Sequence, residues 1–172
     1  MPALRISEAR ITDPDAQLLV EAVQEEYVVR YGGRDESPID VAEFVPPLGA
    51  FFVGRLDGQP VASGAWRRRS DVDFAGTTNT AEVKRMYVVP SARGLGLARA
   101  MLAHLEATAR DAGVDALVLE TGMKQPEAIA LYESSGYAAI PGFGYYRDSG
   151  ISRCFGKPLV LSACPADTPV FE

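Results

Sequence analysis

Residues 81–112 constrain the fold of this chain more than any other segment. They begin with a run rich in β-forming side chains that leads to Pro90, which cannot donate a hydrogen bond to a strand ladder. Two glycines follow, and from Leu97 to Ala109 an apolar residue recurs at four-residue intervals, the pattern of a helix that packs on a sheet. A strand joined through a glycine-bearing turn to such a helix predicts a sheet with helices against it.

Turn signals and apolar spacing predict the remaining elements. Asp13-Pro14 begins a helix that should end near Tyr31, where Gly32-Gly33 follows. Asp57-Gly58 joins two β-rich runs as a hairpin. Strands are expected at 4–11, 51–56, 61–68, 81–89, 116–120 and 154–161, and further helices at 39–44, 94–112 and 126–135. This order predicts a mixed sheet covered by helices.

Composition limits the classes of function. A chain of 172 residues with 47% hydrophobic and 23% charged residues predicts one globular domain over 1–172. Charged residues interrupt 1–11, so we expect neither a signal peptide nor a membrane span, and a cytoplasmic protein. The net charge of -6 works against nucleic-acid binding. His104, Cys154 and Cys164 lack metal-ligand spacing, so no metal is expected and the thiols are interpreted as buried or incidental.

The turn after Pro90 suits an anion such as pyrophosphate. Gly94 and Gly96 let the backbone approach phosphate closely, and the free amides and dipole of the following helix favour negative charge. Arg93 and Arg99 add positive charge. The glycine pair alone is equally consistent with a tight turn that binds nothing. The P-loop ending is absent, and the third glycine of a dinucleotide fingerprint would fall at Arg99.

Two motifs resemble the GNAT superfamily of N-acetyltransferases. Arg93-x-x-Gly96-x-Ala98 is similar to the family motif Arg/Gln-x-x-Gly-x-Gly/Ala, and residues 125–137 resemble Asn-x-x-Ala-x-x-Leu-Tyr-x-x-x-Gly-Phe, with Gln125 in place of Asn and Tyr137 in place of Phe. The resemblance covers residues 49–161 well and is weaker over the first two helices. It implies an α/β fold of the α+β type, with a central, mixed but mostly antiparallel sheet flanked by helices.

The same resemblance implies acetyl-CoA as co-substrate and assigns residues to it. Met86 and Val88 would offer backbone groups to the pantetheine arm, and an N–H near Val88 would stabilise the carbonyl oxyanion. Gln125 keeps an amide where the family often has an asparagine that contacts the cofactor. The full set of expected cofactor-binding residues is Met86, Tyr87, Val88, Arg93, Gly94, Gly96, Leu97, Ala98, Arg99 and Gln125.

Two catalytic residues follow from the resemblance. Tyr132 matches the tyrosine that protonates the departing thiolate, and the alternative is a ring that only packs between helix and sheet. Glu82 resembles the glutamate that some members use as general base, often through water. The alternative for Glu82 is a solvated strand-end carboxylate paired with Lys84 or Arg85.

The resulting hypothesis is direct, sequential transfer of an acetyl group to a primary amine of a small molecule or peptide. Two alternatives stay open: a CoA-binding regulatory module without transferase activity, and an acyltransferase with a different donor or acceptor. The resemblance also implies that a homodimer can form. Candidates for the acceptor pocket are Glu25, Glu26, Tyr27, Tyr31, Tyr145, Tyr146 and Arg147, whereas 67–69 is interpreted as a solvated turn and His104 as a surface residue.

Overall fold

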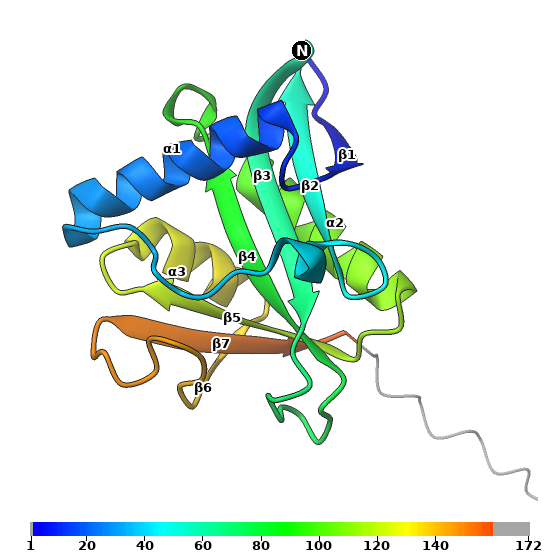
Figure 1. The fold of residues 1–172 in the computed structure, drawn as a ribbon, viewed down its shortest axis with the longest axis vertical. Coiled ribbons are helices and arrows are strands. Elements are labelled where there is room, and N and C mark those ends of the chain that lie inside the picture. The colour runs from blue at the N-terminus through cyan, green and yellow to red at the C-terminus, as the bar shows by residue number, and fades with distance from the viewer. Residues whose placement is uncertain (1, 160–172) are drawn as a thin grey trace, which may run out of the picture.

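The computed structural model describes residues 2–159, which form one seven-stranded sheet with helices on both faces (Figure 1). The strand order is β1-β2-β3-β4-β5-β7-β6. Along the chain the elements are β1 (Arg5–Ala9), α1 (Pro14–Tyr31), the 3-10 turn η1 (Val41–Phe44), β2 (Gly49–Leu56), β3 (Gln59–Arg68), β4 (Thr80–Val88), the 3-10 turn η2 (Pro90–Ala92), α2 (Leu97–Asp111), β5 (Ala116–Gly122), α3 (Pro126–Ser134), β6 (Ala138–Ile140) and β7 (Ser152–Pro158).

Local signals place most of these elements. Asp57 and Gly58 both have positive φ, 48° and 78°, as the predicted tight hairpin between β2 and β3 requires. The α1 helix ends at Tyr31 because Gly32 takes the left-handed conformation and its amide donates to Val28 O at 2.9 Å. The hairpin and the end of this helix are therefore confirmed.

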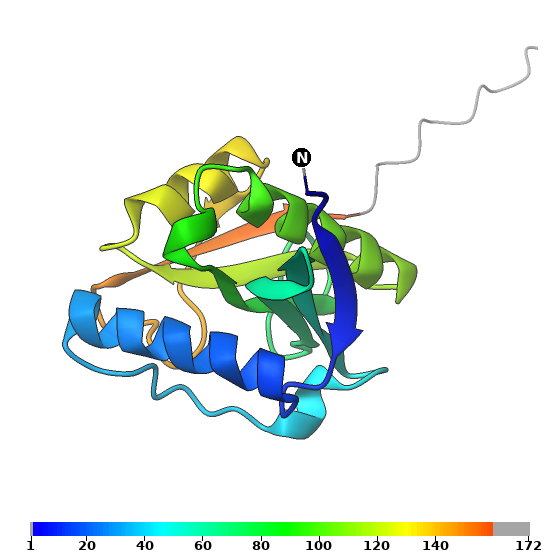
Figure 2. The same ribbon diagram turned by 90° about the horizontal axis from the view of Figure 1, so that it is seen from above.

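The helices form two layers, with α1 and η1 on one face of the sheet and α2 and α3 on the other (Figure 2). Leu19 and Val23 carry the apolar side of α1 into one core. Leu105 of α2 packs into the second core together with Trp66, whose indole N–H donates to Thr108 Oγ1 at 3.1 Å. Within residues 2–159, no helix is both long and apolar enough to cross a membrane.

The sheet opens in the middle, between β4 and β5. These strands are parallel and pair only where residues 80–82 face 116–118. Beyond Glu82 the two strands diverge (Figure 1), and β4 carries one extra residue opposite β3, a bulge at which Arg85 has a φ of 55°. The far part of β4 therefore has an unpaired edge that faces the gap.

The edge strands differ from the sequence expectation. β6 pairs with β7 over residues 138–140 and was not predicted, because three residues are too short to show an alternating pattern. β7 starts at Ser152, ahead of the predicted 154, and the part of that prediction beyond Leu159 lies outside the described residues, as does Cys164. The predicted helix at 39–44 is the short 3-10 turn η1.

Candidate active site

Two adjoining hollows meet at the gap in the sheet. We call the first, about 340 Å³, the α2–α3 groove, because it lies between the end of β4 and the starts of α2 and α3. The second, about 400 Å³, is the α1 cavity, bounded by the end of α1, residues 32–36, β4, β5 and the loop before β7. Both are lined by Met86, Gln125, Ala128 and Tyr132, so the two hollows share one wall.

Every residue predicted to bind the cofactor lines the α2–α3 groove. These are Met86, Tyr87, Val88, Arg93, Gly94, Gly96, Leu97, Ala98, Arg99 and Gln125. The structure therefore brings together two motifs that are about 30 residues apart in the sequence. Of the two predicted catalytic residues, Tyr132 lines both hollows and Glu82 lines neither.

The glycine turn before α2 leaves backbone amides free. Gly94 and Gly96 have φ values of 81° and 77°, a conformation that residues with a side chain adopt at a cost. Gly96 is the N-cap of α2, and no side chain in the described part of the chain caps this helix. A β-carbon at either glycine would meet nothing within 4 Å, so the backbone conformation rather than crowding requires glycine there. The result is a helix N-terminus open to an anion.

The two arginines of this motif have different surroundings. Arg93 turns back toward the sheet, where its Nε donates to Val88 O at 2.9 Å and its Nη2 to Glu26 at 2.8 Å. Arg99 donates only to hydroxyls, those of Ser134 and Ser135 at 2.8 and 3.1 Å. Its charge is not balanced by a carboxylate within the described chain, so Arg99 is the better placed of the two to attract phosphate.

The bulge in β4 is held by a buried hydroxyl. Ser63 Oγ on β3 donates to the Arg85 carbonyl at 2.7 Å. The bulge shifts the alternation of β4 by one residue, so that Val88 rather than Tyr87 belongs to the core beneath α2, and Tyr87 packs beneath α1. The backbone of Met86 and its neighbours thus lies at the open strand edge, between the groove and the cavity.

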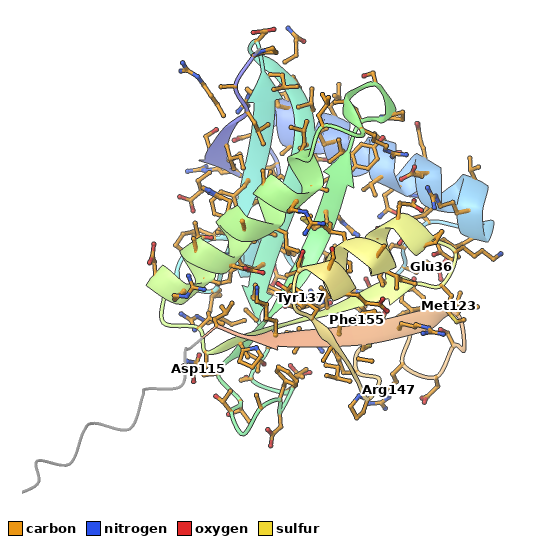
Figure 3. All side chains as sticks on the ribbon, turned by 180° about the vertical axis from the view of Figure 1, so that it is seen from behind. Glu36, Asp115, Met123, Tyr137, Arg147 and Phe155 are labelled. Carbon is orange, nitrogen blue, oxygen red and sulfur yellow. The ribbon has the colours of Figure 1, made fainter. Side chains whose placement is uncertain are left out.

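Tyr132 is buried at the wall shared by the two hollows. Its ring contacts Tyr137 edge-on with the centroids 5.8 Å apart, and its centroid lies 6.4 Å from that of Phe155. Figure 3 shows Tyr137 just beyond α3 and Phe155 on β7. Burial raises the pKa of the Tyr132 hydroxyl above its usual value, which keeps the proton on the oxygen near neutral pH. The hydroxyl is therefore protonated but is a weaker acid than a solvated tyrosine, and its position at the shared wall is what suits it to proton donation.

Glu82 lies beneath the site in an ion-pair cluster. It is 3% exposed, and its Oε2 accepts hydrogen bonds from Arg67 and Arg69. Lys84 Nζ lies 3.6 Å from its Oε1. The interpretation of 67–69 as a solvated turn is wrong, because Arg67 is buried between Glu82 and Glu43 at the end of β3. The predicted role of Glu82 as a base stays a prediction, and its carboxylate already has three cationic neighbours.

Glu120 at the end of β5 is a carboxylate that the sequence analysis missed. It lines the α1 cavity, and its pKa is raised to about 7, chiefly by burial, with Lys84 opposing the shift and Glu82 and Asp35 adding to it. A carboxylate with a pKa near neutrality suits a general base. A charged residue closing the apolar run 116–119 was the available signal.

Some of the acceptor-pocket candidates line the α1 cavity, and their role stays a prediction. Tyr27, Tyr31 and Tyr146 line it, whereas Glu26 lines the groove. Tyr146 Oη accepts a hydrogen bond of 2.7 Å from the Glu36 amide, which ties the loop before β7 to the segment after α1. Glu25, Tyr145 and Arg147 line neither hollow.

His104 and Cys154 could in principle carry out acid–base or nucleophilic chemistry, but both are packed against other side chains. His104 is half-buried rather than at the surface, with its ring edge-on to Phe52 at 4.7 Å. Cys154 is buried and 3.8 Å from Glu120 Oε2, and burial raises its thiol pKa to about 11. Residues 2–159 contain no cluster of three or more His, Cys, Asp or Glu side chains that could hold a metal.

Comparisons with known proteins agree with this geometry. The model of the "Acetyltransferase (GNAT) family" matches residues 16–137. The chain is 36% identical over 160 residues to an IAA acetyltransferase of Azospirillum brasilense, covering 92% of this chain and 100% of that protein.

Two solved structures are similar in fold. A Klebsiella pneumoniae protein assigned to the acyl-CoA N-acyltransferases has a TM-score of 0.74 and 30% identity, over 91% of this chain and 98% of that one. A Salmonella typhimurium protein assigned as an acetyltransferase, solved with its cofactor acetyl-CoA, has a TM-score of 0.67 and 21% identity, over 96% and 99%. The predicted fold class and the resemblance drawn from the two motifs are confirmed, and the chain belongs to the acetyltransferase (GNAT) family and is a transferase enzyme.

Proposed function

We propose that this enzyme transfers an acetyl group directly from acetyl-CoA to the primary amine of a small molecule or peptide. The observation that carries the proposal is the shared wall at Tyr132, where a donor in the α2–α3 groove and an acceptor in the α1 cavity would meet. Transfer between two substrates bound together needs no covalent enzyme intermediate. The alternative is a route through a covalent acyl-enzyme, for which Cys154 is a poor nucleophile because it is buried and its thiol pKa is raised.

The residues of the groove fit the donor. Within residues 2–159 no side chain caps the start of α2, which offers amides to the pyrophosphate, and the only partners of Arg99 there are hydroxyls, so it adds positive charge. The open edge of β4 suits the two amide groups of the pantetheine arm, which can bind like an added strand. Gln125 starts α3 at the shared wall, and its Oε1 is held by Thr121 Oγ1 at 3.2 Å.

The reaction needs one proton removed and one supplied. We assign the first to Glu120, which accepts the proton from the attacking amine as the new C–N bond forms. Tyr132 donates its proton to the departing sulfur as the C–S bond breaks. A β4 amide near Val88 stabilises the oxyanion that forms between these steps.

Glu82 remains the second candidate for the base, acting through water. Its negative charge also raises the pKa of Glu120, so it contributes to proton affinity at the site even without direct contact with the acceptor. Replacing each carboxylate separately distinguishes the two roles. If Glu120 is the base, Glu120→Gln abolishes the pH-dependent limb of kcat/KM, whereas Glu82→Gln shifts its midpoint to lower pH.

The first test is calorimetric titration with acetyl-CoA and CoA, together with an amine panel in which released thiol is measured. Binding with amine-dependent thiol release supports the proposal. Failure of acetyl-CoA to bind would overturn the assignment of the groove. The cytoplasmic location, the homodimer and the single domain over 1–172 stay predictions from the sequence.

A further inference from the structure

Two residues that line the α1 cavity have buried polar atoms that are unsatisfied. Within residues 2–159, two buried side-chain atoms have no hydrogen-bond partner, Tyr31 Oη and Arg85 Nε, and both residues line this cavity. The Lys124 amide faces Tyr31 Oη without reaching hydrogen-bond geometry. Buried groups of this kind are rarely left unpaired, because each loses its hydrogen bonds to water. Their presence in one cavity points to a ligand that supplies the missing partner.

Of the two unpaired atoms, Arg85 Nε is the stronger evidence for a ligand. Its side chain is 5% exposed, and Nη1 donates to Asp35 at 2.8 Å. A guanidinium presents its N–H groups as planar forks that match a carboxylate. Within residues 2–159, Nε has no partner and Nη1 is the only nitrogen of this guanidinium with a hydrogen bond, so the fork formed by Nε and Nη2 is not engaged there. The bulge that directs Arg85 keeps it at a φ of 55°, so the chain holds a strained residue in this place.

Positive charge exceeds negative charge on this wall. Asp35 is shared by Arg85 and by Lys84, whose Nζ lies 3.7 Å away. Glu82 also faces Lys84, but it is engaged by Arg67 and Arg69. These arginines are in turn bound by Glu43 and Asp71, outside the cavity. Among the described residues, the β4 side of the α1 cavity therefore has two cations, Lys84 and Arg85, for the one carboxylate of Asp35.

The remaining charged groups lie elsewhere on the cavity. Arg34 is paired with Glu21 at 2.5 Å, so its charge is already compensated. Glu36 is at the end bounded by Tyr146, and its amide rather than its side chain makes that contact. Glu120 comes from β5, across the gap from β4. The cavity thus offers an arginine fork on one strand and a proton acceptor on the other.

We infer that the acceptor is a small amine that also carries a carboxylate, as an amino acid does; this rests on the proposed function. The carboxylate binds the free fork of Arg85, and the amine lies toward Glu120 and Tyr132. Tyr27, Tyr31, Tyr146 and Ile151 line the same cavity and favour an aromatic or aliphatic side chain on the ligand. A volume of about 400 Å³ lies within the usual range for small-molecule sites.

Matched acid and amide pairs test this inference. Thiol release is measured with phenylalanine, phenylalaninamide and phenethylamine, and with the corresponding set for leucine. We expect kcat/KM to be at least about tenfold higher for the best free acid than for its amide, as loss of a charge-assisted hydrogen bond to a buried group implies. If every amide or decarboxylated amine reacts as well as its acid, the carboxylate site is wrong although the transferase function stands. If acetyl-CoA binds and no amine releases thiol, the proposed function itself fails.

A binding measurement gives a readout independent of turnover. With CoA bound, calorimetry compares 3-phenylpropanoate with 3-phenylpropanamide, which lack the reactive amine. We expect the acid to bind at least about tenfold more tightly than the amide. Equal binding of the two probes would overturn the inference.

Variants connect the selectivity to Arg85. Arg85→Gln should reduce the acid-to-amide ratio toward one, and Arg85→Lys should retain part of it because the charge remains. Arg147→Gln is the matched control, since Arg147 is 65% exposed and lines neither hollow. Thermal unfolding and acetyl-CoA affinity show whether each variant is folded, and the wild-type pairs decide the question even if Arg85→Gln is not. An unchanged ratio in a folded Arg85→Gln variant would contradict the assignment.

Discussion

Gly122, near the end of β5, packs directly against the Tyr31 side chain at the end of α1, so closely that a β-carbon on Gly122 would overlap the Tyr31 hydroxyl. This contact fixes how near α1 approaches β5, and hence the width of the α1 cavity that both residues line. No positive φ requires glycine at this position. The requirement is steric and arises only in the folded chain.

Gly122→Ala should therefore displace Tyr31 and enlarge or distort the α1 cavity. We expect a loss of about 1–3 kcal/mol in the free energy of unfolding, as for other overpacked positions. Acetyl-CoA affinity should change little, because Gly122 does not line the α2–α3 groove. Urea unfolding and calorimetry measure the two quantities. A stable Gly122→Ala variant with an unchanged acceptor KM would contradict this role.

Glu120 should control the acidic limb of activity. Because its folded pKa is raised to about 7, kcat/KM should fall as the pH drops below this value and the base becomes protonated. The same shift makes the folded protein less stable at higher pH, although it makes the enzyme more active there. The folded chain holds this proton more tightly than the unfolded chain, so the free energy of unfolding decreases as the pH rises from the usual carboxyl pKa through about 7.

Glu120→Gln tests both effects. The variant should lose the acidic limb of kcat/KM, and its free energy of unfolding should no longer decrease on account of this residue between the usual carboxyl pKa and about pH 7. Asp71→Asn is a control, since Asp71 is an exposed carboxylate whose pKa is lowered by Arg69 rather than raised. A Glu120→Gln enzyme with a wild-type pH profile would exclude Glu120 as the base.

Tyr132→Phe should distinguish the catalytic role of the hydroxyl from the packing role of the ring. We expect kcat to fall about a hundredfold, within the range for loss of a general acid, whereas acetyl-CoA affinity and Tm should change little because the ring contact with Tyr137 is kept. Single-turnover kinetics measure the chemical step. Unchanged turnover would remove the hydroxyl from the mechanism.

Gly96→Ala should weaken the binding of acetyl-CoA. With φ at 77°, a β-carbon costs about 1–2 kcal/mol of stability and distorts the amides at the start of α2. Gly113→Ala is a matched control at the other end of this helix, with φ at 83° and similarly open space. Both variants should lose stability, but only Gly96→Ala should lose acetyl-CoA affinity by calorimetry. Equal affinities would argue against the α2–α3 groove as the donor site.

The buried cluster around Glu82 should contribute to stability. Glu82→Gln leaves Arg67 and Arg69 without their shared buried carboxylate, and we expect the free energy of unfolding to fall by about 3 kcal/mol. Glu43→Gln removes a carboxylate that is 43% exposed and pairs with the same Arg67, so it should cost less than about 1 kcal/mol. Chemical denaturation distinguishes the two. Equal losses would show that burial does not set the strength of this cluster.

The sequence alone predicted the parts of this protein that depend on near neighbours. Gly32 ends α1, Asp57-Gly58 turns the β2–β3 hairpin, and the glycines after Pro90 open α2, because turn conformations and helix ends depend on residues a few positions apart. The residues proposed to bind the donor were predicted from two contiguous motifs, and the structure places all of them along one groove.

Only the tertiary structure decided the acceptor side. Arg85 and Asp35 are 50 positions apart and meet because β4 bulges beneath the segment that follows α1. Glu120 has a high pKa because the folded chain buries it among the charges of Glu82, Lys84 and Asp35. Glu82, expected to be solvated or catalytic, is surrounded by arginines from the end of β3 and the turn that follows it. Burial and charge pairing depend on distances between strands, and sequence spacing does not encode these distances until the chain has folded.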